Sequence, residues 1–229
     1  MTVDRSKVQL ADLPFDRRTL MLGTTAGLAM VAAGGLTMLS SGPAMAAPQV
    51  GKPAPDFTAV DSRGQTQSLS ALRGRIVALE WTNHDCPYVR KHYNAGNMQA
   101  LQRKAADADV VWLSVISSPP GEQGHVSPEQ ADALTDTRKA TPAAVLLDPT
   151  GQVGRAYDAR VTPHMYLINA EGVLVYMGGI DSIPSARVED IEKATPYFRD
   201  ALAAVIKGEP VQNAVTRPYG CSVKYRTSS

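Results

Sequence analysis

The chain has 229 residues, of which 44% are hydrophobic, and its 23 basic and 22 acidic side chains nearly cancel. This balance, without any run of basic residues interleaved with aromatic ones, lacks the electrostatic footprint of nucleic-acid binding, so we exclude that class. The only two cysteines, Cys86 and Cys221, allow at most one internal disulfide, and a chain of this length can bury a sufficient core without one. The two thiols therefore need a chemical explanation.

Residues 1–46 have the layout of an export signal rather than of a folded domain. Residues 20–39 carry no charge, an arginine pair at 17–18 precedes them, and a small-x-small cleavage pattern ends at Ala46. The arginine pair resembles the twin-arginine signal, which implies the twin-arginine translocase as a partner and a periplasmic or other extracytoplasmic location. We predict cleavage near Ala46. An uncleaved membrane anchor is the alternative, because about twenty apolar residues can span a hydrocarbon core.

The first elements of residues 47–229 are an expected hairpin, a strand and a helix. A turn signal at 61–64 separates two short extended pieces and predicts the hairpin. Residues 76–81 form a mostly apolar run of strand length, typical of a central strand that is covered on both faces. Directly after them, Pro87 opens a mixed polar and apolar stretch that predicts one helix to about residue 106.

The remaining pattern alternates strands with helices. A Ser cap followed by Pro128 predicts a helix start. We further expect strands at 110–117 and 143–148, a short helix at 152–158, a strand hairpin at 164–169 and 173–177, a helix at 197–207 and then an irregular tail. This order predicts an α/β fold with a central mixed β-sheet flanked by helices and an N-terminal hairpin extension.

Cys86 lies where thiol chemistry is expected. The preceding strand delivers its sulfur to the carboxyl edge of the sheet, where open α/β sheets place their sites. Unpaired N–H groups at a helix start stabilise a thiolate, and the neighbours His84 and Arg90 can support it. The alternative is a buried, inert cysteine that happens to open a helix.

Residues 81–93, Trp-Thr-Asn-His-Asp-Cys-Pro-Tyr-Val-Arg-Lys-His-Tyr, resemble the active-site strand, turn and helix of thioredoxin-like redoxins. The opening at 51–57, Gly-Lys-Pro-Ala-Pro-Asp-Phe, is similar to that of peroxiredoxins and other alkyl hydroperoxide reductase and thiol-specific antioxidant proteins. This resemblance implies a thioredoxin-like fold over 47–229 and a thiol oxidoreductase that needs no cofactor. It also implies a peroxide or a protein disulfide as substrate and an external thioredoxin-like thiol as reductant.

Two departures from these families bear on the activity. Cys-Pro-Tyr matches the start of a glutaredoxin motif, but Val89 occupies the position of the second cysteine, so Cys86 cannot form the local disulfide. Peroxiredoxins carry Thr or Ser three residues before the reactive cysteine, where this chain has Asn83, with Thr82 one residue further away. Peroxide reduction and disulfide exchange both stay open, with Thr82 and Pro87 as candidate substrate contacts and Asn83 as a supporting residue.

The Thr162-Pro163 pair precedes the strand expected at 164–169. In thioredoxin-like folds a proline at this place is cis and faces the active cysteine, and the backbone before it binds an extended substrate. The resemblance therefore assigns substrate binding to Thr162 and Pro163. An ordinary trans proline at a strand start is the alternative.

The tail around Cys221 has an unexpectedly specific sequence, Tyr-Gly-Cys-Ser-Val-Lys-Tyr at 219–225. If it folds back over the carboxyl edge of the sheet, Cys221 can resolve an oxidised Cys86 through a long-range disulfide. A purely structural disulfide and an unpaired thiol are the alternatives.

A metal-binding module is the rival class of function. His84, His92 and His164, together with Cys86, supply ligand types suited to copper or zinc. Copper-delivering thioredoxin-like proteins use two nearby cysteines, however, and this chain has one at the motif. We therefore assign no metal site and keep copper binding as an alternative.

Overall fold

The computed structural model describes residues 47–226. The predicted export signal at 1–46, with its cleavage position, lies outside the described residues. No helix in the described part of the chain is long and apolar enough to cross a membrane.

The described residues form a seven-stranded mixed sheet with the order β2-β1-β5-β4-β3-β7-β8 and a two-stranded sheet of β6 and β9. The strands are Thr58–Asp61 (β1), Thr66–Ser68 (β2), Val77–Trp81 (β3), Val111–Ile116 (β4), Ala144–Leu147 (β5), Val161–Thr162 (β6), His164–Ile168 (β7), Leu174–Gly178 (β8) and Cys221–Ser222 (β9). β3 runs parallel to β4 and antiparallel to β7, so it lies at the centre of the sheet. All five of its residues are buried, as expected for a strand covered on both faces.

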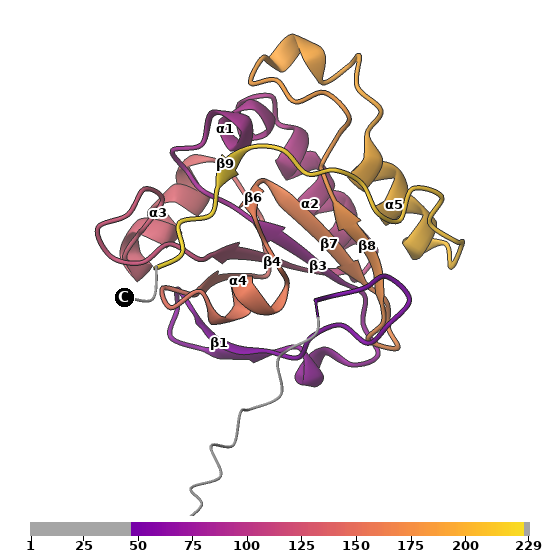
Figure 1. The fold of residues 1–229 in the computed structure, drawn as a ribbon, viewed down its shortest axis with the longest axis horizontal. Coiled ribbons are helices and arrows are strands. Elements are labelled where there is room, and N and C mark those ends of the chain that lie inside the picture. Colours follow the sequence, from indigo (N-terminus) through magenta and orange to yellow (C-terminus); the bar gives the residue numbers. More distant parts are fainter. Residues whose placement is uncertain (1–46, 227–229) are drawn as a thin grey trace, which may run out of the picture. The chain divides into compact units, whose positions relative to one another are not determined.

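Helices cover both faces of the sheet, as Figure 1 shows. They are Pro87–Asn94 (α1), Asn97–Asp107 (α2), Pro128–Thr137 (α3), Gln152–Ala156 (α4) and Tyr197–Ile206 (α5), with short 3-10 turns at Ser70–Leu72 and Val188–Asp190. One core cluster joins Trp81 to the residues of α4, and the other joins Ala78 to α1, α2 and α5. The thioredoxin-like α/β fold expected from the sequence is confirmed.

The expected single helix from Pro87 to about residue 106 is wrong, because two helices occupy this stretch. The backbone of Gly96 adopts a φ of 71°, which only glycine reaches readily, and this ends the first helix before α2 begins. The expected Ser cap of α3 is confirmed, since Ser127 and Gln130 form a reciprocal capping box. The opening hairpin is also present, and its first strand pairs with β5, so the hairpin widens the central sheet.

The C-terminal tail returns to the middle of the molecule after α5. In Figure 1 the yellow tail passes β6 and α1 and ends close to α4. β9 pairs antiparallel with β6, with Val161 opposite Ser222 and Thr162 opposite Cys221. This pairing brings the second cysteine to the strand that leads into Pro163.

Candidate active site

Cys86 is held at the start of α1 by the turn that follows β3. Its N–H donates to the carbonyl of Asn83 at 3.1 Å, and its own carbonyl accepts from Arg90 N at 2.9 Å as the first bond of the helix. Asn83 stabilises the turn through its side-chain oxygen, which accepts from Asp85 N at 2.9 Å. Pro87 follows as the first helical residue, where its missing N–H costs nothing.

The Cys86 thiol is fully buried, and it faces the residue before Pro163. Its Sγ donates to the carbonyl oxygen of Thr162 at 3.1 Å. The Thr162-Pro163 peptide bond is cis, as the resemblance to thioredoxin-like proteins predicts. Cys86, Thr162 and Pro163, which are far apart in the sequence, therefore lie together at the expected site.

The tail supplies the fourth expected residue, Cys221. Val223 N donates to Arg160 O at 2.9 Å and continues the ladder that pairs Cys221 with Thr162. Gly220 makes the close approach possible, because a Cβ at this position would lie 1.9 Å from the carbonyl oxygen of Thr162. Its φ of 142° also lies in a region that other residues rarely adopt.

Both thiols are free, and Thr162 connects the two cysteines, since its carbonyl accepts from Cys86 Sγ and it stands opposite Cys221 in the strand pairing. Burial raises the pKa of the Cys221 thiol to about 12, and the neighbouring Cys86 acts in the same direction. The positive charges of Lys224 and Arg90 oppose this shift. The arrangement therefore favours a protonated Cys221 beside Cys86 in the reduced protein.

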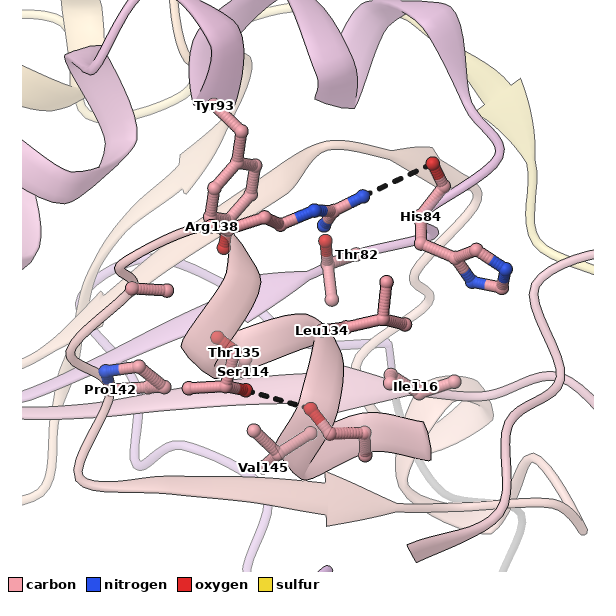
Figure 2. Close-up of a pocket in the computed structure, with 12 residues that line it drawn as sticks. Thr82, His84, Tyr93, Ser114, Ile116, Leu134, Thr135, Arg138, Pro142 and Val145 are labelled. Atoms are coloured by element: carbon pink, nitrogen blue, oxygen red, sulfur yellow. Dashed lines mark hydrogen bonds between the residues drawn. The ribbon is translucent and has the colours of Figure 1, made fainter. Parts of the chain in front are cut away.

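Thr82 and His84 are brought together at a small cavity beside α1. Both line a cavity of about 30 Å³ together with Arg138 and Tyr93, as Figure 2 shows. Arg138 Nη2 donates to the backbone carbonyl of His84 at 3.1 Å. A cavity of this size holds a single water molecule and no substrate. Cys86 does not line it, and the Thr82 hydroxyl makes no hydrogen bond to the Cys86 sulfur.

Sequence reasoning missed the buried carboxylate of Glu80. It accepts hydrogen bonds from Tyr93 Oη at 2.8 Å, Trp112 Nε1 at 2.9 Å and Ser114 Oγ at 3.1 Å. Burial raises the pKa of this carboxyl, while its hydrogen-bond donors act in the opposite direction. An acidic residue inside an apolar strand was the available signal, because such a position is normally apolar.

Sequence reasoning also missed a buried charge cluster under the tail. Lys91 Nζ lies 3.2 Å from Asp181 Oδ2, and both side chains are almost completely buried. His92 lies 3.6 Å from the same oxygen, and burial lowers its pKa to about 4. Nothing in the sequence marks this cluster, because Asp181 is 90 residues away from Lys91 along the chain.

The histidines of the metal alternative are separated in the structure. His92 faces Asp181, whereas His164 packs against Tyr166, whose hydroxyl lies 3.0 Å from the imidazole Nδ1. Within residues 47–226, no three His, Cys, Asp or Glu side chains gather in an arrangement that could hold a metal ion.

The fold and the family match define the class of protein as a thioredoxin-like thiol oxidoreductase. Residues 50–177 match the AhpC/TSA family, and the chain belongs to that family. A search of curated proteins finds no match.

Solved structures share the fold at low identity. An uncharacterized conserved protein from Geobacillus kaustophilus is 24% identical, with a TM-score of 0.66 over 79% of this chain and 94% of its own. A hypothetical protein from Sinorhizobium meliloti is 22% identical, with a TM-score of 0.66 over 80% and 98% of the two chains. A structure titled as a putative protein disulfide isomerase from Bacteroides thetaiotaomicron is 21% identical, with a TM-score of 0.51 over 70% and 91%.

Proposed function

We propose that Cys86 and Cys221 form a dithiol/disulfide pair that reduces a disulfide substrate and is regenerated by an external thiol. The pairing of β6 with β9 is the observation that carries this proposal. It sets Cys221 opposite Thr162, whose carbonyl accepts the hydrogen bond from Cys86. The long-range pair takes the place of the local disulfide that Val89 excludes.

The two cysteine thiols together supply the two electrons that reduce the substrate disulfide. The Cys86 thiolate attacks one sulfur of the substrate disulfide, forms a mixed disulfide and releases the other sulfur as a thiolate. Cys221 then loses its proton and attacks the Cys86 sulfur, which releases the second substrate thiolate and leaves the Cys86–Cys221 disulfide. Two thiols of an external reductant return both cysteines to the reduced state by the same exchange.

A disulfide suits the surroundings of Cys86 better than a peroxide does. The side-chain oxygen of Asn83 is engaged by Asp85 N, and Thr82 lines a separate cavity. A larger cavity of about 560 Å³ opens beside the tail, with Val161 and Gly220 among its lining residues, next to the paired Thr162 and Cys221. A substrate larger than a peroxide therefore has room to bind beside the tail, and it reaches the buried Cys86 when the tail opens.

Peroxide reduction is the second candidate, and membership of the AhpC/TSA family favours it. In that reaction the Cys86 thiolate attacks one peroxide oxygen, becomes a sulfenic acid and releases an alcohol or water. The Cys221 thiol condenses with the sulfenic acid, which forms the same disulfide and releases one water molecule.

One oxidation experiment tests the pair and separates the two substrates. The reduced protein and its Cys221→Ser and Cys86→Ser variants are treated with either oxidised glutathione or hydrogen peroxide, and the products are mapped by mass. We expect a Cys86–Cys221 disulfide in the parent protein and a trapped glutathione adduct on Cys86 in Cys221→Ser. Faster oxidation by peroxide, with a sulfenic acid in Cys221→Ser, would instead identify the peroxidase. A parent protein that forms no disulfide with either oxidant contradicts the proposal.

We further propose that residues 1–46 are an export signal and that the remaining chain acts outside the cytoplasm, consistent with disulfide chemistry. The uncharged run after the arginine pair supports this proposal. Replacing both Arg17 and Arg18 by lysine is expected to abolish export, as seen by fractionating cells that produce the full chain. Unchanged export of the double variant would rule out the twin-arginine route.

A further inference from the structure

The cluster of Lys91, Asp181 and His92 has no role in the thiol exchange proposed above, yet it is buried under the tail. The side chains of Lys91 and His92 are fully enclosed, and that of Asp181 is 4% exposed. Buried charges are costly unless their remaining hydrogen-bonding capacity is satisfied. The residue that provides the remaining hydrogen bonds of this cluster therefore indicates what the cluster holds in place.

That partner is Tyr219 of the tail. Its hydroxyl donates to Asp181 Oδ1 and accepts from Lys91 Nζ at 3.3 Å. Its ring packs edge-on against Tyr88, with 5.7 Å between the ring centroids. Lys91 and Tyr88 both belong to α1, the helix that Cys86 opens. Tyr219 thus joins the tail to the reactive helix through charged partners.

Tyr219 is two residues before Cys221, and its contacts limit how far that cysteine can move. Between them, Gly220 lies directly against the carbonyl of Thr162. On the other side of Cys221, the hydroxyl of Tyr225 donates to Ala159 O at 2.6 Å. The tail is therefore attached on both sides of its cysteine. The Tyr225 side is held by Arg155, which stacks on the ring and donates to Arg226 O at 2.7 Å, whereas the Tyr219 side reaches a buried ion pair, whose charged groups make the stronger hydrogen bonds.

We infer that Tyr219 is the positioning residue of the thiol pair, with the buried Lys91–Asp181 pair as the receptor for its hydroxyl. This inference rests on the proposed function, in which Cys221 must meet Cys86. When the Tyr219 hydroxyl is bound to this pair, β9 stays paired with β6. The hydroxyl therefore controls the equilibrium between the closed tail and a tail that has moved away from Cys86.

The burial of Cys86 makes this inference measurable without any turnover. Its side chain is 0% exposed, so an alkylating reagent reaches the sulfur only after local opening, and under this inference the segment that opens is the tail, whose Tyr219 and Cys221 pack against the same cluster. The rate of alkylation of the reduced protein then follows the opening equilibrium.

Tyr219→Phe tests the inference because it retains the ring and removes only the hydroxyl. Tyr157→Phe is the matched control, since Tyr157 is also buried and donates its hydroxyl to a single acceptor, Pro55 O at 2.7 Å, but belongs to the core cluster on the other face. The full chain and both variants are reduced and alkylated, and the labelled cysteine is identified by mass. Thermal unfolding of each variant reports its folded state.

We expect Cys86 to be alkylated about tenfold faster in Tyr219→Phe than in the parent protein, and at an unchanged rate in Tyr157→Phe. At a fixed ratio of reduced to oxidised glutathione, the Cys86–Cys221 disulfide is also expected in a smaller fraction of the Tyr219→Phe molecules than of the parent protein. Equal rates in Tyr219→Phe and the parent protein, or the same acceleration in both variants, would overturn the inference. A parent protein without the disulfide, but with the alkylation contrast intact, would contradict only the proposed function.

Discussion

Cys86 and Cys221 are positioned by two different kinds of structure. Cys86 is fixed by the fold itself, because it follows the fully buried β3 and caps an eight-residue helix. Cys221 belongs to a two-residue strand that depends on a few long-range contacts. The reactive sulfur is thus as stable as the domain, whereas its partner can leave after local opening alone. This difference suits a pair in which one sulfur must release the other to admit a substrate.

The largest expected effect comes from breaking the cluster that connects the two regions. Lys91→Met leaves the Asp181 carboxylate buried without its ammonium partner, and removing one member of a buried ion pair costs about 3–5 kcal/mol. We expect the free energy of unfolding to fall by about that amount, measured by urea denaturation. The surface variant Lys193→Met, whose lysine is 66% exposed, is the control and should change stability little. Equal losses in the two variants would contradict a special role for the buried cluster.

Acid is expected to weaken the folded state through its buried histidines. Burial lowers the pKa of His92 to about 4 and that of His164 to about 3, both below the ordinary value of 6.5. As the pH falls, the histidines of the unfolded chain therefore bind protons before those of the folded protein do. The contribution of the two neutral histidines to the free energy of unfolding is thus complete above pH 6.5 and declines as the pH falls towards 4. For His92 alone the loss is about 3 kcal/mol.

Urea denaturation between pH 7 and pH 4 measures this decline, and His92→Gln should make it shallower. A decline of the same steepness in His92→Gln would show that His92 is already protonated in the folded state. Carboxylates with lowered pKa values, such as that of Asp190 at about 2, affect stability only at lower pH.

Replacing Gly220 separates the two cysteines without touching either sulfur. Gly220→Ala places a Cβ against the carbonyl of Thr162 and forces alanine into an unfavourable φ, at a cost of about 2 kcal/mol. We expect the tail to be displaced and the alkylation of reduced Cys86 to become about thirtyfold faster. Gly208→Ala is the control, because its φ is also positive but no atom lies within 4 Å of the added Cβ. Equal acceleration in the two variants would show that strain anywhere loosens the site.

The smallest effect is expected at the hydrogen bond of Tyr225, on the C-terminal side of Cys221. Tyr225→Phe removes one hydrogen bond to Ala159 O, worth about 1 kcal/mol, and retains the stacking of the ring on Arg155. Alkylation of Cys86 should become about fivefold faster, less than in Tyr219→Phe. A larger effect in Tyr225→Phe would show that the C-terminal attachment dominates the position of Cys221.

Much of the fold is visible in local patterns. The apolar run at 76–81 predicts β3, and Ser127 with Pro128 predicts the start of α3, because burial and capping depend on neighbouring residues. The break at Gly96 was missed because a glycine within a helical pattern is often tolerated. Local sequence also gave no sign that Lys91 is buried. It looks like a solvated helix residue, and only the folded structure places Asp181 and Tyr219 around it.

The sequence by itself determined that Cys86 opens a helix after a buried strand, that Val89 excludes a local disulfide and, through the family resemblance, that Pro163 is cis. Only the tertiary structure decided that the tail pairs with β6, that Thr82 lines a small cavity to which Cys86 does not contribute and that Tyr219 completes a buried charge cluster. The physical reason is the distance along the chain over which each kind of signal acts. Hydrophobic periodicity and capping report contacts within a few residues, whereas Cys86 and Cys221 are brought to the same residue, Thr162, across more than half of the chain.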